Sequence, residues 1–147
     1  MERGVRRAAG TQSFTDLLRH PKRIVGHFTA EAQGRAEADI AALNAGEARA
    51  VSAFTRDGSR FRQGILILDP AAPSPVVWLP FRLFRRSGES IALLAPFHVH
   101  GAGPVTDPGS HTIDKNQFRL LSIQDADQYW EIAIPTIDVP LVRAALR

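Results

Sequence analysis

The sequence predicts an α+β domain, an antiparallel barrel of about seven strands that a C-terminal helix caps. Short apolar or alternating stretches, separated by turn residues, recur between residues 49 and 134, which is typical of strands in a barrel or sandwich. No helical stretch lies between consecutive strands, so parallel β–α–β units are not expected. Residues 138–147 carry apolar side chains at helical spacing, which predicts a short amphipathic helix at the end of the domain.

Composition places the chain among single-domain globular proteins. Its 147 residues are 44% hydrophobic and 22% charged, which suits one core and is too short for two comfortable domains. The lack of cysteine excludes a disulfide framework, a zinc–thiolate site and thiol chemistry. No apolar run approaches the roughly 20 residues that span a bilayer. No apolar segment follows the N-terminal arginines either, so we expect no signal peptide and a cytoplasmic location.

The basic charge is concentrated at the N-terminus. Residues 1–30 contain six Lys or Arg and two acidic residues, a net charge of +4, whereas the remaining residues sum to −1. Phosphate binding by a folded domain usually requires a basic face on that domain. We therefore expect no specific nucleic-acid partner.

Residues 1–28 are predicted to be a basic, partly disordered arm, and residues 29–147 a single domain. The first part of the arm is charged and lacks periodicity, so we expect it to be disordered. Ser13 and Asp16 form a capping-box pattern, which predicts a short helix that ends near Pro21.

Two helices are predicted at the ends of the single domain. Thr29 can cap the first, over residues 29–45, where alanines and other strong helix formers predominate. Asp138 is the expected N-cap of the second, over residues 138–147, and Pro140 falls in its first turn, where proline is tolerated.

The strands are predicted from apolar alternation and from the turn residues between them. Asp57 and Gly58 form a strong hairpin signal between the first two strands. Pro80 predicts an edge or a bend in the third, because proline cannot donate to a sheet ladder. Within the barrel range 49–134, the predicted strands cover residues 50–55, 60–68, 76–81, 90–95, 97–99, 118–123 and 128–134, with another starting near 111.

Three stretches of the sequence stand out: residues 63–69, residues 78–80, and residues 131–135 running into 138–146. They resemble bacterial pleckstrin-homology-like domains of the actinobacterial type. The resemblance covers residues 49–147. It implies about seven antiparallel strands in two nearly orthogonal sheets, with one opening capped by the C-terminal helix. It also implies a non-catalytic binding or scaffolding role, in a group whose bacterial ligands are generally unknown.

Arginines in the predicted turns are the first candidate site. The resemblance implies that several turns meet at one open end, where basic residues of related domains bind phosphoinositides. Guanidinium groups suit phosphate because they offer planar bidentate donors. Binding of an anionic ligand or a membrane surface is therefore an alternative function. The candidates for this rim are Arg56, Arg60, Arg85 and Arg86, from a wider set that includes Arg62.

The turn before the last strand opposes this hypothesis. Asp125 and Asp127 would place two carboxylates at the same rim, where they repel an anion or neutralise the arginines. Solvated turn charges, each contributing little to stability, are the simpler interpretation of the arginines.

Three histidines are the second candidate site. His98 and His100 lie on one side of the chain if this stretch is extended, and His111 or Asp107 would add a further ligand. The pattern resembles a cupin metal site, which makes a metal-dependent cupin-like enzyme another alternative. The acidic ligand of that pattern is absent, because Gly-Ala-Gly-Pro follows at 101–104. The main prediction is therefore no bound metal and no cofactor.

The sequence carries no catalytic signature. It lacks a Gly-x-Ser-x-Gly elbow, a phosphate-binding glycine loop with lysine and a His-Glu-x-x-His helix. Adjacent Tyr129 and Trp130 face opposite sides of a strand, so we expect one in the core and the other outside it. We predict a non-catalytic module that binds a protein partner or associates with itself, with a peptide adding to an open sheet edge bounded by Pro80.

Overall fold

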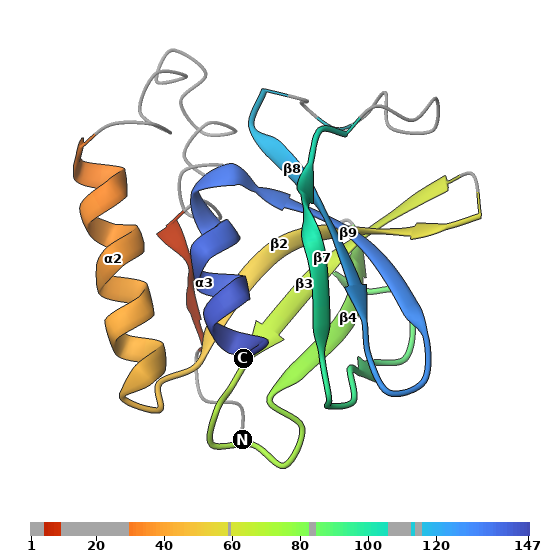
Figure 1. Cartoon of the computed structure of the whole chain (residues 1–147), viewed down its shortest axis with the longest axis horizontal. Coiled ribbons are helices and arrows are strands. Elements are labelled where there is room, and N and C mark those ends of the chain that lie inside the picture. The colour runs from red at the N-terminus through yellow and green to blue at the C-terminus, as the bar shows by residue number, and fades with distance from the viewer. Residues whose placement is uncertain (1–4, 10–29, 59, 83–84, 106–112, 114–115) are drawn as a thin grey trace.

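A computed structural model describes residues 5–9, 30–58, 60–82, 85–105, 113 and 116–147 of the chain. It shows an α+β fold in which strands β2 to β9 form an antiparallel sheet and a helix ends the chain, as predicted (Figure 1). The strands are β1 Arg6–Arg7, β2 Arg49–Asp57, β3 Arg60–Leu68, β4 Val76–Arg82, β5 Arg85–Arg86, β6 Ile91–Ala92, β7 His98–Gly103, β8 Phe118–Gln124 and β9 Tyr129–Pro135. The helices are α2 Ala30–Asn44, the 3-10 helix η3 Thr136–Asp138 and α3 Val139–Ala145.

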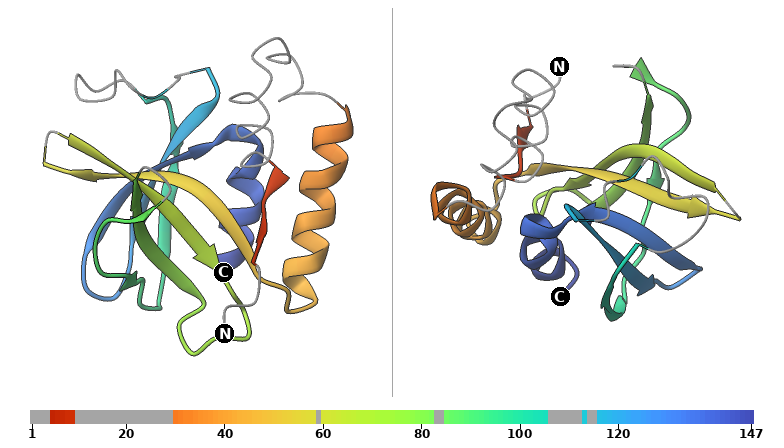
Figure 2. Two further views of the ribbon diagram at one scale, coloured as in Figure 1. Left: turned by 180° about the vertical axis from the view of Figure 1, so that it is seen from behind. Right: turned by 90° about the horizontal axis from the view of Figure 1, so that it is seen from above.

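The sheet bends strongly but does not close. Its hydrogen-bonded order is β5-β4-β3-β2-β9-β8-β7, with β6 added to β4 and β1 added in parallel to β2. Two halves of the sheet meet where Phe54 pairs with Ala133 and Thr55 with Ile132, and they diverge away from that seam (Figure 2). The prediction of a barrel is corrected in this respect, because β5 and β7 end the ladder without pairing with each other.

The main core fills the space between the two halves of the sheet. Period-2 alternation directs every second side chain of the long strands into this space. Helix α3 closes it with Leu141 and Val142, and Leu146, directly after the helix, adds to them; all three are buried. The strand residues of this core are Val51, Ala53, Leu66, Leu68, Val76, Trp78, Leu121, Ile123, Trp130, Ile132 and Ile134.

A second apolar cluster covers the opposite face of the sheet near the seam. The rings of Phe54 and Phe118 meet edge to face, with centroids 5.5 Å apart, and Val105 and Ile113 bury them further. Both faces of β2 are therefore covered, and its residues 49–51 and 53–55 are buried.

Helix α2 is tied to the sheet by a buried ion pair. Asp39 accepts a hydrogen bond from Arg49 Nε at 2.9 Å through Oδ1 and another from the Ala9 N–H at 2.7 Å through Oδ2. The side chains of Arg49 and Asp39 are only 8% and 11% exposed. Ala32 and Ala36 pack against Ala9 in a small apolar cluster. Asp39 thus connects α2, the segment after β1 and the start of β2.

The described part of the N-terminal arm, residues 5–9, runs beside β2. Arg6 and Arg7 pair with Arg49 and Ala50 in a parallel bridge, and Ala8 is buried. Residues 6–8 thus form backbone pairs along β2, and the prediction of a partly disordered arm over residues 1–28 stays a prediction. The helix predicted between Ser13 and Pro21 lies outside the described residues.

The other boundaries differ from the predictions in local ways. The chain enters the last helix through η3, and Asp138, the predicted cap, makes no capping side-chain hydrogen bond. The strand predicted over 90–95 is only Ile91–Ala92, because the Leu94 N–H donates to a side chain instead of to a ladder. The strand predicted near residue 111 lies largely outside the described residues. None of the described helices is long and apolar enough to cross a bilayer.

Candidate functional site

Strand β7 is the long strand at the open end of the sheet. It pairs with β8, and among the strands that the structure describes the ladder stops there. The other outer strand, β4, has its far edge covered by β5 and β6, so the edge predicted near Pro80 is not the longest free one. An unpaired strand edge presents a row of backbone donors and acceptors that another strand can use.

A bulge interrupts β7 at His100. Val99 is paired with Ile123 and Gly101 with Ser122, so His100 has no partner in the register. Gly101 has φ of +145°, a conformation that favours glycine. Bulges of this kind bend a strand and change the direction of the side chain at the bulge.

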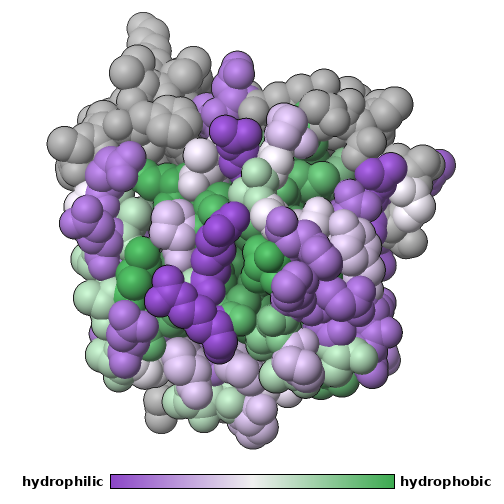
Figure 3. All heavy atoms as spheres, in the orientation of Figure 1, coloured by the Kyte–Doolittle hydropathy of each residue, from purple (hydrophilic) through white to green (hydrophobic). Residues whose placement is uncertain are grey.

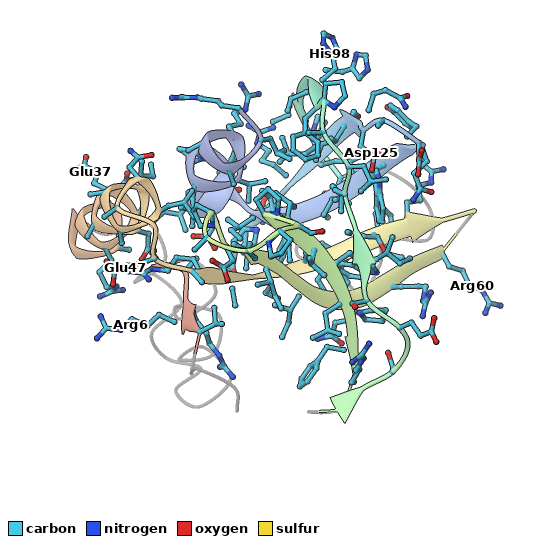
Figure 4. The ribbon with its side chains drawn as sticks, turned by 90° about the horizontal axis from the view of Figure 1, so that it is seen from below. Arg6, Glu37, Glu47, Arg60, His98 and Asp125 are labelled. Carbon is cyan, nitrogen blue, oxygen red and sulfur yellow. The ribbon has the colours of Figure 1, made fainter. Side chains whose placement is uncertain are left out.

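Three rings gather on the outward face beside the bulge. The ring centroids of His98 and His100 are 4.6 Å apart, and those of His100 and Tyr129 are 6.0 Å apart. His98 and His100 are both exposed, and Tyr129 is 52% exposed. Figure 4 shows His98 projecting away from the ribbon. We refer to His98, His100 and Tyr129 as the histidine–tyrosine cluster.

This cluster bears out two predictions from the sequence. His98 and His100 do share one side of an extended strand. Trp130 is buried in the core while Tyr129 faces outward. His111 and Asp107, the other proposed metal ligands, lie outside the described residues. Among the described residues, no group of three His, Cys, Asp or Glu side chains is arranged to hold a metal ion.

Half-buried apolar residues lie at the start of β7 and at the start of α3. Phe97 and Val99, at β7, and Val139, on α3, are half-buried and pack against the main core. Figure 3 shows hydrophobic surface in the area between α3 and β7 of the view in Figure 1, with hydrophilic side chains on both sides. We refer to Phe97, Val99 and Val139 as the apolar strip.

Asp125, in the turn between β8 and β9, fixes the segment that leads into β7. Its Oδ1 accepts the N–H groups of Asp127 at 2.8 Å and Gln128 at 2.7 Å. Its Oδ2 accepts the Leu94 N–H at 3.1 Å and the Trp130 indole N–H at 3.2 Å. This carboxylate is buried and satisfied, so the expectation that it faces an open rim and repels anions is wrong for Asp125.

The same contacts decide the acidity of Asp125. Burial by itself raises the pKa, but the backbone N–H groups of Gln128, Leu94 and Asp127 and the indole of Trp130 stabilise the charged form. The donors outweigh burial, and the pKa of Asp125 lies below its ordinary value.

Asp125→Asn is therefore expected to destabilise the protein by about 2 kcal/mol at neutral pH, because the amide NH₂ group cannot accept two of the four hydrogen bonds. The folded-state pKa is lowered, so the carboxylate's contribution is complete above the unfolded pKa of about 3.9 and is lost as pH falls through the folded pKa. Urea unfolding at pH 7 and at several values below 4 measures both effects. Equal pH dependence in the native and Asp125→Asn proteins would contradict the assignment.

The two candidate sites, the arginine rim and the histidines, lie apart from each other. Arg60, on the β2–β3 hairpin, and His98 lie at well-separated places on the surface (Figure 4). Arg56 contacts Glu131 at 3.4 Å and donates through Nε to the Gly58 carbonyl at 3.0 Å. An ion pair with a carboxylate leaves Arg56 less suited to an external anion.

Two of the arginines named from the sequence, Arg62 and Arg86, both lie near Gly88. Arg86 Nε donates to the Gly88 carbonyl at 2.8 Å, and Arg62 Nη2 lies 3.4 Å from where a Cβ of Gly88 would be. The side chain of Arg85 lies outside the described part of the structure. Anion binding by the four predicted arginines stays a prediction.

Two shallow hollows lie beside Asp69, the residue that follows β3. One, of about 350 Å³, lies between the ends of α2 and α3; the other, of about 530 Å³, lies beside β1. Asp69 borders both. Neither hollow contains a residue that the sequence marked as a candidate.

Comparisons of the chain with protein-family models, with curated proteins and with solved structures find no match. The His-x-His spacing was the signal for the outward face of β7. No local signal could reveal that β7 ends the sheet or that Tyr129 lies beside His100, because both depend on strand pairing.

Proposed function

We propose that this protein is a non-catalytic, pleckstrin-homology-like interaction module that binds an extended peptide segment of a partner protein along β7. The order of the strands supports the fold assignment. Two antiparallel groups, β4-β3-β2 and β9-β8-β7, meet at a seam, and a C-terminal helix fills the opening between them. This arrangement agrees with what the sequence resemblance implies.

The observation that carries the functional proposal is the free edge of β7. A six-residue strand with one neighbour among the described strands offers its outward backbone groups to a further strand. Strand addition gives affinity through main-chain hydrogen bonds and specificity through alternate side chains.

The two sides of the edge suit different side chains of the added peptide. Inward residues would rest on the apolar strip between β7 and α3, where burial of apolar area favours binding. Outward residues would lie beside the histidine–tyrosine cluster, whose rings offer stacking surfaces and N–H or O–H groups. The expected ligand is therefore an extended segment with apolar residues at alternate positions.

Val139→Glu is expected to weaken such a peptide about tenfold or more, because it places a carboxylate where an apolar side chain is to be buried. Val139 begins α3, where an acidic residue is compatible with the helix. The peptide would be selected from a random library on the native protein, and its binding measured by calorimetry.

Ile91→Glu, at an exposed apolar residue of β6, is the matched control and should leave binding unchanged. Amide hydrogen exchange with the peptide bound should show new protection at residues 98–103. Failure to select any peptide, or protection confined to other strands, would refute the proposal.

A further inference from the structure

We infer that His98 and His100 chelate a divalent metal ion of intermediate softness, Cu²⁺, Ni²⁺ or Zn²⁺. Each histidine would supply one ring nitrogen on the outward face of β7. This inference goes beyond peptide binding and does not depend on it. It concerns two imidazoles that the described structure brings together, without His111 or Asp107 and without any reaction.

The geometry of the pair is the first argument. The two rings lie 4.6 Å apart between centroids and are inclined by 71° rather than stacked in parallel. Imidazole nitrogens bind these metal ions at about 2.0–2.1 Å, so a single ion has to sit between two nearby rings. Only side-chain rotation is needed for that, because both histidines are exposed and project from a strand held by its register with β8.

The bulge is the second argument. In a regular strand, His98 and His100 would each pair with a residue of β8. Here His98 faces Gln124 while His100 is the unpaired residue between Val99 and Gly101. The bulge lets the His100 ring lie close to both His98 and Tyr129.

The neighbouring groups select the class of metal ion. Imidazole suits copper, nickel and zinc, whereas magnesium and calcium require oxygen ligands. Gln124, beside His98 on β8, donates through Nε2 to the Asp125 carbonyl, so its amide oxygen is the atom able to act as a weak third ligand. The carboxylate of Glu131 is engaged by Arg56. Two imidazoles with open positions for water are therefore the expected coordination.

The test is metal titration of the full chain, with Ni²⁺ and Zn²⁺ by calorimetry and with Cu²⁺ by electron paramagnetic resonance. We expect one equivalent that shows two nitrogen ligands, and no binding of Mg²⁺. His98→Ala and His100→Ala should each raise the Kd about tenfold or more, since each removes one metal–nitrogen bond. Both residues are exposed, so circular dichroism should show an unchanged fold.

The chain has five histidines, and His20, His27 and His111 provide the matched controls. Alanine at any of these three should leave the Kd unchanged. Undiminished binding by the His98→Ala/His100→Ala protein, or loss of binding in His111→Ala, would overturn the inference. Because no peptide is used, failure here leaves the proposed function unaffected, and failure of peptide selection leaves this result unaffected.

Discussion

Asp39→Asn is expected to lower the free energy of unfolding by about 3–5 kcal/mol, because it leaves the Arg49 guanidinium buried without its carboxylate. Arg49 Nε lies 2.9 Å from the Asp39 carboxylate, which also accepts a hydrogen bond from the Ala9 N–H at 2.7 Å. An asparagine keeps one acceptor oxygen but loses the charge that offsets the burial of Arg49. Urea denaturation at neutral pH measures the loss.

Two variants separate the charge from other effects of substitution in α2. Glu37→Gln removes an exposed carboxylate from the same helix and should change stability by less than about 0.5 kcal/mol. Replacing both partners, as Asp39→Leu with Arg49→Met, should cost less than Asp39→Asn alone, because no charge remains buried. A double replacement that is as harmful as the single one would show that shape, and not charge, is decisive at this contact.

Gly64→Ala is the second large effect, with an expected loss of about 3 kcal/mol. A Cβ at residue 64 would lie 2.3 Å from Cη2 of Trp78 and 2.5 Å from the Leu79 carbonyl oxygen. Gly64 pairs with Pro80 on β4, so the indole of the fully buried Trp78 crosses directly over its backbone. The added methyl group has to displace β4 as well as a ring that the core holds on all sides.

Gly103→Ala is the matched control for this prediction. Gly103 also lies in a strand, but a Cβ there meets no atom within 4 Å, so the substitution should be close to neutral. Combining Gly64→Ala with Trp78→Leu should not add the two losses in full, since the smaller side chain removes one of the two clashes. Simple additivity, or wild-type stability of Gly64→Ala, would be inconsistent with the packing described.

Element types were largely predictable, because they depend on the period of apolar residues in short windows. β3 was predicted over residues 60–68, as observed, and α2 over 29–45 where Ala30–Asn44 is found. The predictions of element boundaries fail where a backbone N–H group forms a hydrogen bond with a residue far away in sequence. Leu94 leaves the predicted strand to bind Asp125, and Arg6 and Arg7 join β2 although nothing near them in sequence predicts a strand.

The candidate site could be predicted only in part for the same reason. The alternation of side chains along a strand predicted that His98 and His100 share a face and that Tyr129 and Trp130 do not. It could not place Tyr129 beside His100, since these residues are joined through β8. Asp125 shows the limit most clearly: a turn carboxylate expected at an open rim accepts four hydrogen bonds in the interior.

The α+β class, the helix at the C-terminus and the apolar side of each strand could all be inferred from the order of residues alone. These features follow from the 3.6- and 2-residue periods and from turn residues, which act over a few positions along the chain. Only the folded chain shows that the sheet stays open, that β7 is the edge of its described strands, and that two imidazoles lie next to that edge. Such features depend on pairing between segments far apart in sequence, whose register is set by burial of a shared core.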